Sequence, residues 1–399
     1  MQLLDTAKKN NVLSSMMKII DKNREALLEA NKKDLDAFDR EDQALYDRLV
    51  VNEQKIDGMI QALKEVRDQD DPVNQEISKR VLDSGLEIIN RTAPFGTIMI
   101  IYESRPDVTI EAAVLAFKAN NKILLKGGKE AYNSNKLLVE FWHKALAEND
   151  LDKEWITMLN MDRAATQEFL RNPDQQLDLV VPRGGERLIA FVKEHAKCAV
   201  LISGRGNNFL YVHPEADWKK TLQVIINAKT DKISGCNALD KVLVDVNLPD
   251  YEKRLKDLQE TLHAAKVEII VDEKVGKSLT ELDKIKDDNV WFEEFLAMKI
   301  AIGAVDGIEE AIAKINKYSG GHSSVILTED KKMAQVFMEQ VDSAAVYHNA
   351  STRFTDGGQM GVGAELAIST DKLHHRGPLG LKQLVTNKYY VFGDGHIRV

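Results

Sequence analysis

The stretch that decides the fold runs from residue 98 to residue 128 and reads IMIIYESRPDVTIEAAVLAFKANNKILLKGG. Its first apolar run, residues 98–101, predicts a buried strand, and the amphipathic stretch from about 107 to 119 predicts a helix. A second apolar run at 123–125 predicts another strand, which the Gly-Gly pair ends. A strand, a helix and a strand in this order form a βαβ unit, so we expect a parallel sheet.

The same alternation continues on both sides of a predicted boundary near residue 230. Before it, we expect a helix to about 147 and strands at 177–181 and 199–202. After it, short apolar runs alternate again with amphipathic stretches. The later strands are expected at 241–246, 267–271 and 324–327, and the later helices at 250–265, 306–317 and 331–340. The spacing of apolar residues in the first 90 residues predicts helices, and residues 384–399 predict a strand that pairs with a partner subunit.

Composition narrows the class of protein. A chain of 399 residues with 44% apolar residues suggests two large domains. The net charge of −9, without a basic block, argues against nucleic-acid or membrane binding. Two cysteines make no disulfide framework, and we expect a cytoplasmic protein, because no signal peptide and no apolar run of ~18 residues occurs. The histidines show no metal-binding spacing, so we expect no metal.

Two Gly-Gly turns follow predicted strands and are candidates for cofactor binding. They are Lys126-Gly127-Gly128 and Arg183-Gly184-Gly185. Glycine allows the backbone to approach a phosphate, the following helix supplies N–H groups, and a lysine adds charge for a ribose phosphate. Neither turn is a GxGxxG motif, and ordinary tight turns have the same composition.

Cys236 is the candidate nucleophile. Gly235 precedes it, and we expect a helix to begin at the cysteine, where backbone N–H groups would favour the thiolate and hold an oxyanion. A lone cysteine is more often a small buried core residue, and that interpretation also suits Cys198, which lies in an apolar run.

Three further motifs resemble the gamma-glutamyl phosphate reductase family of the aldehyde dehydrogenase superfamily. They are IYESRPDVT at 101–109, NASTRFTDG at 349–357 and GAELAISTDKLHHRGP at 363–378. The resemblance runs from about residue 85 to the end. It implies an aldehyde-dehydrogenase-like α/β fold of two parallel-sheet domains with a small oligomerisation flap.

The resemblance also implies an activity: reduction of L-glutamyl 5-phosphate by NADPH in proline biosynthesis, through a thioester on Cys236 in the Gly-Cys-Asn-Ala motif. Asn237, the residue after Cys236, is the second catalytic candidate. The substrate-binding candidates are Ser104, Arg105, Asn349, Ser351, Thr352 and Arg353, the two arginines because a guanidinium matches phosphate and carboxylate bidentately. The cofactor-binding candidates are Lys126, Gly127, Gly128, Arg183, Gly184, Gly185 and Glu294.

The implied domains are an NADP-binding domain (1–83 and 102–229), a catalytic domain (230–380) and the flap (84–101 and 381–399). A homo-oligomer is expected, and transient contact with glutamate 5-kinase is a candidate interaction. The sequence departs from the family at 231–235, where an arginine-proline pair is usual, and at Lys126, where arginine is usual. These changes leave the preference between NADP and NAD open.

Two other functions stay open. Another acylating aldehyde dehydrogenase would use a coenzyme A thioester, and a non-catalytic scaffold would only bind nucleotide. Hydrolytic relatives carry a glutamate before a Gly-Gly pair, whereas the stretch 201–207 contains no carboxylate. Its absence suits a thioester that exchanges with phosphate.

Overall fold

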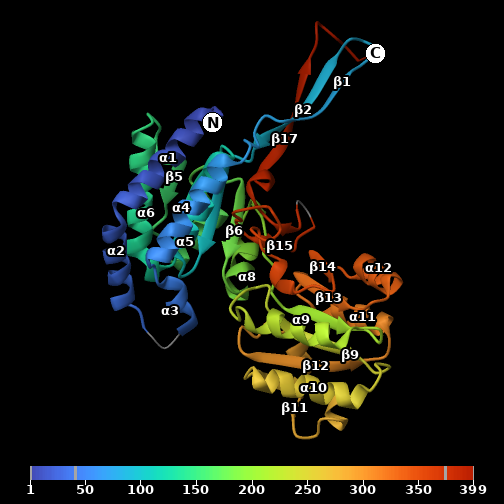
Figure 1. Ribbon diagram of the computed structural model, residues 1–399. Coiled ribbons are helices and arrows are strands. Elements are labelled where there is room, and N and C mark those ends of the chain that lie inside the picture. Colours follow the sequence, from blue (N-terminus) through green and yellow to red (C-terminus); the bar gives the residue numbers. More distant parts are fainter. Residues whose placement is uncertain (1, 40–42, 373–374, 399) are drawn as a thin grey trace. The chain divides into compact units, whose positions relative to one another are not determined.

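The computed structural model describes residues 2–39, 43–372 and 375–398, and the chain forms two compact units (Figure 1). Unit 1 comprises Met1–Ile202, Gly361–Ala367 and Leu379–Val399, and unit 2 comprises Ser203–Met360 and Ile368–Pro378. Each unit has its own parallel sheet with helices on both faces, so the prediction of two parallel-sheet α/β domains is confirmed. No helix of the described residues is both long and apolar enough to span a bilayer.

The sheet of unit 1 has five parallel strands with β3 at its centre. Their order is β5 (Ile156–Met158), β4 (Lys122–Lys126), β3 (Thr97–Tyr102), β6 (Leu179–Arg183) and β7 (Ala199–Val200). All six residues of β3 are buried, which is why the strand is a continuous apolar run in the sequence. The βαβ unit predicted at 98–128 is therefore confirmed.

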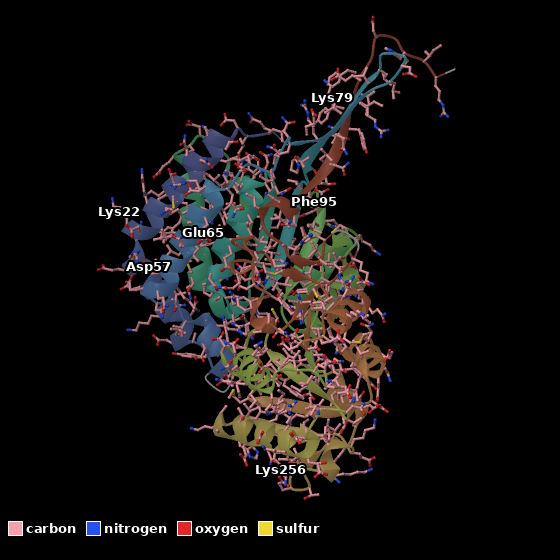
Figure 2. The ribbon with its side chains drawn as sticks, turned by 45° about the vertical axis from the view of Figure 1, so that its right-hand side comes forward. Lys22, Asp57, Glu65, Lys79, Phe95 and Lys256 are labelled. Atoms are coloured by element: carbon pink, nitrogen blue, oxygen red, sulfur yellow. The ribbon has the colours of Figure 1, made fainter. Side chains whose placement is uncertain are left out.

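Helices cover both faces of this sheet. One face packs against α1 (Thr6–Lys22), α4 (Glu53–Asp68), α5 (Pro106–Lys118) and α6 (Tyr132–Ala147), and the other against α7 (Arg163–Arg171) and α8 (Glu186–His195). The helices α2 (Arg24–Asp36) and α3 (Gln43–Leu49) complete the first layer. Charged side chains such as Lys22, Asp57 and Glu65 lie on its solvent side (Figure 2).

Unit 1 also carries a three-stranded antiparallel sheet, here called the flap sheet. It consists of β1 (Glu76–Val81), β2 (Glu87–Pro94) and β17 (Val385–Phe392), with β2 in the middle. The expectation of helices up to residue 90 is wrong for 76–90, because all of β1 is exposed and gives no buried periodicity. Residues 97–101, expected in the flap, lie instead in β3 of the parallel sheet.

The sheet of unit 2 has seven parallel strands. Their order is β11 (Asp283–Lys284), β10 (Glu268–Val271), β12 (Lys299–Val305), β9 (Leu239–Asp245), β8 (Asn208–Val212), β13 (Ser323–Leu327) and β14 (Ala345–His348). One face packs against α9 (Trp218–Thr230) and α10 (Tyr251–Ala264), the other against α11 (Ile308–Tyr318) and α12 (Lys331–Gln340). Because β8 and α9 belong here, the division between the units falls at 202/203 instead of the expected 229/230.

Candidate functional site

Residues 231–238, here called the Cys236 turn, connect α9 to β9 at the amino ends of the strands of unit 2. The Ala238 N–H donates to the Gly235 carbonyl at 2.9 Å, and β9 begins at Leu239. The expectation that a helix begins at Cys236 is therefore wrong, because the apolar run that follows is a buried strand. Cys236 is partly exposed. Cys198 is partly exposed as well, but burial raises the pKa of its thiol.

Gly206 packs against the Cys236 turn so closely that it has no room for a side chain. A Cβ at Gly206 would lie 2.6 Å from the carbonyl carbon of Cys236 and 2.5 Å from Oε1 of Glu294. Glu294 precedes β12, as Gly206 precedes β8 and Cys236 precedes β9. The amino ends of these three adjacent strands thus bring a carboxylate to the turn that carries the thiol.

Asn237, Thr352 and Arg353 lie on the other side of the turn. Asn237 Nδ2 donates to the carbonyl oxygens of Arg353 and Thr355 at 3.3 and 2.9 Å, and Thr352 Oγ1 donates to the Asn237 carbonyl at 2.6 Å. Arg353 Nε donates to Asp231 at 2.9 Å, and a Cβ on Gly235 would lie 2.8 Å from Arg353 Nη1. This ion pair sets the Arg353 guanidinium against the residue that precedes Cys236.

Asn349 and Ser351 make local contacts in the loop after β14. Asn349 has a φ of 53°, and its amide accepts from the Thr328 N–H and donates to the Thr328 carbonyl at 2.9 and 2.8 Å. Ser351 Oγ accepts from the Arg353 N–H at 3.3 Å. Asn349 therefore ties the loop to the carboxyl end of β13, whereas Arg353 lies at the Cys236 turn.

Ser104 and Arg105 lie in unit 1, after the carboxyl end of β3. The N–H and Oγ of Ser104 both donate to Oε1 of Glu130, at 2.7 and 2.8 Å. Arg105 forms an ion pair with Asp107 at 2.7 Å. Burial acts to raise the pKa of Asp107, but Arg105 outweighs it and holds that pKa below its usual value.

The two Gly-Gly turns follow β4 and β6, the neighbours of β3. Register pairs Lys126 with Ile101 and Arg183 with Tyr102, so both turns and Ser104 share the carboxyl edge of the sheet. This edge is where ligands bind in open α/β sheets. Lys126 Nζ donates to the Gly127 carbonyl at 3.0 Å, and burial lowers the pKa of Lys126.

The glycines of these turns differ in their surroundings. A Cβ on Gly127 would overlap the side-chain amide of Asn135, so the backbone there is closely packed. Gly185 caps α8 without a side-chain hydrogen bond, and its missing Cβ faces open space. Arg183 Nη1 donates to the Leu366 carbonyl, which gives this candidate cofactor residue a structural contact.

Most of the predicted site residues thus form two groups, whereas Asn349 and Ser351 make local contacts in their loop and Arg105 pairs with Asp107. Unit 2 brings together Cys236, Asn237, Thr352, Arg353 and Glu294, and the carboxyl edge of the unit 1 sheet brings together Ser104, Lys126, Gly127, Gly128, Arg183, Gly184 and Gly185. Sequence reasoning missed Gly206, Asn208 and Glu130. The Gly-Asn-Asn run before an apolar strand was the one signal for the first two. Residues 373–374 of the third motif lie outside the described residues.

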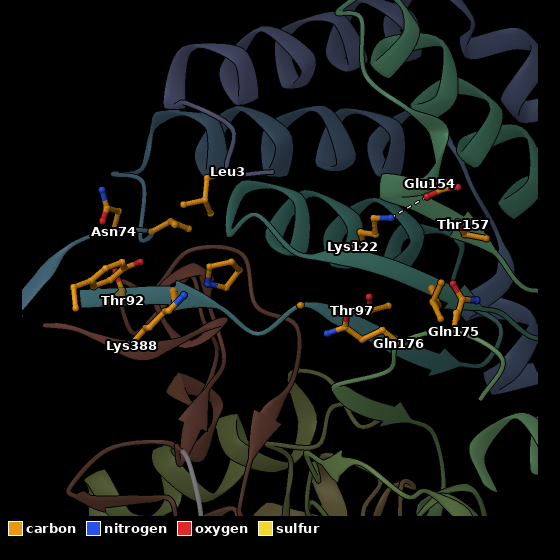
Figure 3. A pocket seen from close by; sticks show the side chains of 16 residues that line it. Leu3, Asn74, Thr92, Thr97, Lys122, Glu154, Thr157, Gln175, Gln176 and Lys388 are labelled. Atoms are coloured by element: carbon orange, nitrogen blue, oxygen red, sulfur yellow. Dashed lines mark hydrogen bonds and ion pairs between the residues drawn. The ribbon is translucent and has the colours of Figure 1, made fainter. Parts of the chain in front are cut away.

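A hollow of about 840 Å³ lies at the opposite, amino edge of the unit 1 sheet (Figure 3). Its lining includes Thr97 and Lys122, where β3 and β4 begin, and Lys388 of the flap sheet. Lys122 forms an ion pair with Glu154 at 2.9 Å. None of the predicted site residues lines this hollow, so it is separate from both groups.

Comparison with known proteins gives consistent matches. The sequence profile of the aldehyde dehydrogenase family matches residues 1–277. Gamma-glutamyl phosphate reductase from Persephonella marina is 42% identical, over 98% of this chain and 89% of its own. The crystal structure of gamma-glutamyl phosphate reductase from Thermotoga maritima has a TM-score of 0.94 at 42% identity, covering 99% of this chain and 95% of that chain.

More distant structures share the fold. An acetylating aldehyde dehydrogenase from Geobacillus thermoglucosidasius has a TM-score of 0.70 at 17% identity, covering 99% of this chain and 94% of that chain. The matches at 42% identity span nearly the whole sequence, including the Cys236 turn and both Gly-Gly turns. The chain therefore belongs to the gamma-glutamyl phosphate reductase family of the aldehyde dehydrogenases.

Proposed function

We propose that this protein catalyses the NADPH-dependent reduction of L-glutamyl 5-phosphate to L-glutamate 5-semialdehyde with release of phosphate, the second step of proline biosynthesis. The observation that carries the proposal is the Cys236 turn: a partly exposed cysteine in a turn whose backbone packs against Gly206 and Arg353, in a chain of this family. The substrate class is that of the gamma-glutamyl phosphate reductases that share 42% of its residues.

The carboxyl edge of the unit 1 sheet fits a nicotinamide cofactor. Gly185 leaves the backbone bare after β6, Gly127 lets the chain pack closely against Asn135 after β4, and Lys126 supplies a cation for a ribose phosphate. The carboxylates of Glu103 and Glu130 lie beside Gly184 and Gly128 and would accept hydrogen bonds from ribose hydroxyls. In unit 2, Glu294 is the further cofactor-binding candidate. When bound, the cofactor supplies the hydride that reduces the acyl group.

The chain's own residues carry the covalent steps. The Cys236 thiolate forms a bond to the acyl carbon, and the bond from that carbon to the phosphate oxygen breaks, so that phosphate leaves with the electron pair. The N–H of Cys236 stabilises the oxyanion. Arg353 and Arg105 bind the phosphate or the carboxylate of the substrate. After reduction, the thiohemiacetal on Cys236 collapses and releases the aldehyde and the thiolate.

The test runs the reaction in reverse with purified protein, glutamate 5-semialdehyde and NADP. NADPH should form only when inorganic phosphate is present. NADPH formation that requires coenzyme A instead would identify a different acylating dehydrogenase. Cofactor binding without turnover under either condition would identify a scaffold. Replacement of NADP by NAD in the same assay measures the cofactor preference.

The flap sheet supports a homo-oligomer. It exposes apolar side chains on its outer strands, including Ile77 and Val81 of β1 and Val391 of β17, which are 56%, 62% and 56% exposed. Monomeric proteins rarely leave such strands uncovered, because edge strands pair with other chains. Light scattering should give a mass above the 44.8 kDa of one chain, and Val391→Lys should lower it. A parent protein that elutes as a monomer would refute this assignment.

A further inference from the structure

Asn208, the first residue of β8, is completely buried and lies under the Cys236 turn. Its Nδ2 donates to three carbonyl oxygens, those of Gly206 at 3.0 Å, Cys236 at 2.8 Å and Ala238 at 2.6 Å. Its Oδ1 accepts from the N–H of Ser323, the first residue of β13, at 3.0 Å. One side chain thus connects the strand ends of β8 and β13 with both ends of the turn that carries the thiol.

These bonds fix the direction of the peptide groups in the turn. In a trans peptide the carbonyl and the following N–H point in opposite directions. Because the Cys236 carbonyl points at Asn208, the N–H of Asn237 points away from it. The Gly206 carbonyl is held in the same way, so the N–H of Asn207 also points away from the Asn208 amide. The orientation of backbone donors around the thiol therefore depends on Asn208.

The Gly206 carbonyl also accepts from the backbone N–H of Asn208 at 3.0 Å, so the side-chain amide of Asn208 matters most at the Cys236 and Ala238 carbonyls. A carboxamide carries two N–H donors, so the three carbonyls must share them. The close packing of Gly206 on the Cys236 carbonyl leaves the turn no room to move toward β8. Packing against Gly206 and hydrogen bonds from Asn208 thus both hold the turn from the side of β8.

We propose that Asn208 is a positioning residue, which orients the Cys236 turn for attack on the acyl carbon through its bonds to the Gly206, Cys236 and Ala238 carbonyls. This inference rests on the proposed nucleophilic role of Cys236. Asn208 acts on catalysis only through the turn, so its loss should reduce kcat and leave the KM for the cofactor unchanged. A residue that merely stabilises the fold would lower the melting temperature without this separation of kcat from KM.

The decisive variant is Asn208→Asp, which keeps the shape and the acceptor for the Ser323 N–H but removes the donors. The matched control is Asn121→Asp in unit 1. Asn121 is also completely buried, donates to the Leu384 carbonyl at 2.9 Å and accepts from the Gly96 N–H at 3.0 Å, at the amino end of β4. Asn208→Ser, whose hydroxyl donates one hydrogen bond, is a milder variant in case the aspartate variant does not fold.

Each variant is assayed for NADP reduction in the presence of phosphate, and its melting temperature is measured. Asn208→Asp should lower kcat at least about tenfold, Asn208→Ser should fall between it and the parent, and the KM for NADP should stay within about threefold. Asn121→Asp should melt earlier but keep kcat within about threefold. A folded Asn208 variant with normal kcat would overturn the inference. Full activity of Cys236→Ser would instead show that Cys236 is not the nucleophile. A loss of kcat in the Asn208 variants could then not be explained by the position of the Cys236 thiol.

Discussion

Replacing Gly206 with alanine should lower the rate of catalysis about 100-fold and also destabilise the fold. A Cβ at this position would lie 2.6 Å from the Cys236 carbonyl carbon and 2.5 Å from Glu294 Oε1. Carbon atoms pack at about 3.5–4.0 Å, so the turn must shift by about 1 Å. A displacement of about 1 Å in a reacting group costs about 100-fold in rate, equivalent to about 2.7 kcal/mol of barrier. Overpacking should cost about 1–3 kcal/mol of folding free energy.

The assay is phosphate-dependent NADP reduction, measured together with urea unfolding. The matched control is Gly58→Ala in the middle of α4, where a Cβ meets nothing within 4 Å. Because glycine inside a helix costs about 0.5–1 kcal/mol relative to alanine, this variant should gain stability and keep its kcat. The reasoning fails if Gly206→Ala retains more than about a tenth of the parental kcat, because the required shift would then not reach the thiol.

Four further predictions concern the two thiols, the two candidate binding cations and one buried histidine. Cys236→Ser should abolish turnover while Cys198→Ser leaves it nearly unchanged, and a comparable loss from the second variant would mean that the other thiol reacts. Lys126→Ala should raise the KM for NADPH more than that for the acyl substrate, and the reverse pattern would separate Lys126 from the cofactor. Arg353→Ala should cost on the order of 2–5 kcal/mol in substrate kcat/KM with a nearly unchanged melting temperature, whereas a large drop in melting temperature with normal kinetics would make it structural. Burial lowers the pKa of His322 to about 4. Below pH 6.5 the unfolded chain therefore binds a proton that the folded chain does not bind. The free energy of unfolding should fall by about 3 kcal/mol as the pH drops from 6.5 to 4. His322→Gln should flatten that dependence in urea unfolding, and an unchanged slope would assign it to other groups.

The elements that the sequence predicted best are those whose burial is uniform. The strand β3 and the helix α5 are buried along nearly their whole length, so both appear as long apolar stretches. The strands β8 and β12 are equally buried, but no strand was predicted for either. β8 begins with a buried asparagine, and β12 contains Gly303, where a Cβ would lie 2.6 Å from the Trp291 ring. Such residues look like loop residues until their packing is known.

The sequence predicted only those site residues that lie within a recognisable motif. Cys236 and Arg353 are 117 positions apart, and the resemblance alone placed both in one site, which the structure brings together through Asp231 and Gly235. Asn349 belongs to the same motif as Arg353 but bonds to Thr328 at the other end of the sheet. The roles of Gly206 and Asn208 depend on distances between strand ends, and no local pattern encodes such distances.

The discontinuous composition of unit 1 has a consequence for biosynthesis. The chain leaves unit 1 at residue 202, and β17, which pairs with β2 along eight residues, comes at the end of the sequence. Ribosomes add roughly 5–20 residues per second, so β2 is made and then waits roughly fifteen to sixty seconds for its partner strand. During that interval unit 2 has nearly all of its chain and can fold first. A nascent chain stalled before residue 385 should therefore expose the edge of β2 and recruit a chaperone at the flap sheet, while the Cys236 turn of unit 2 is already formed.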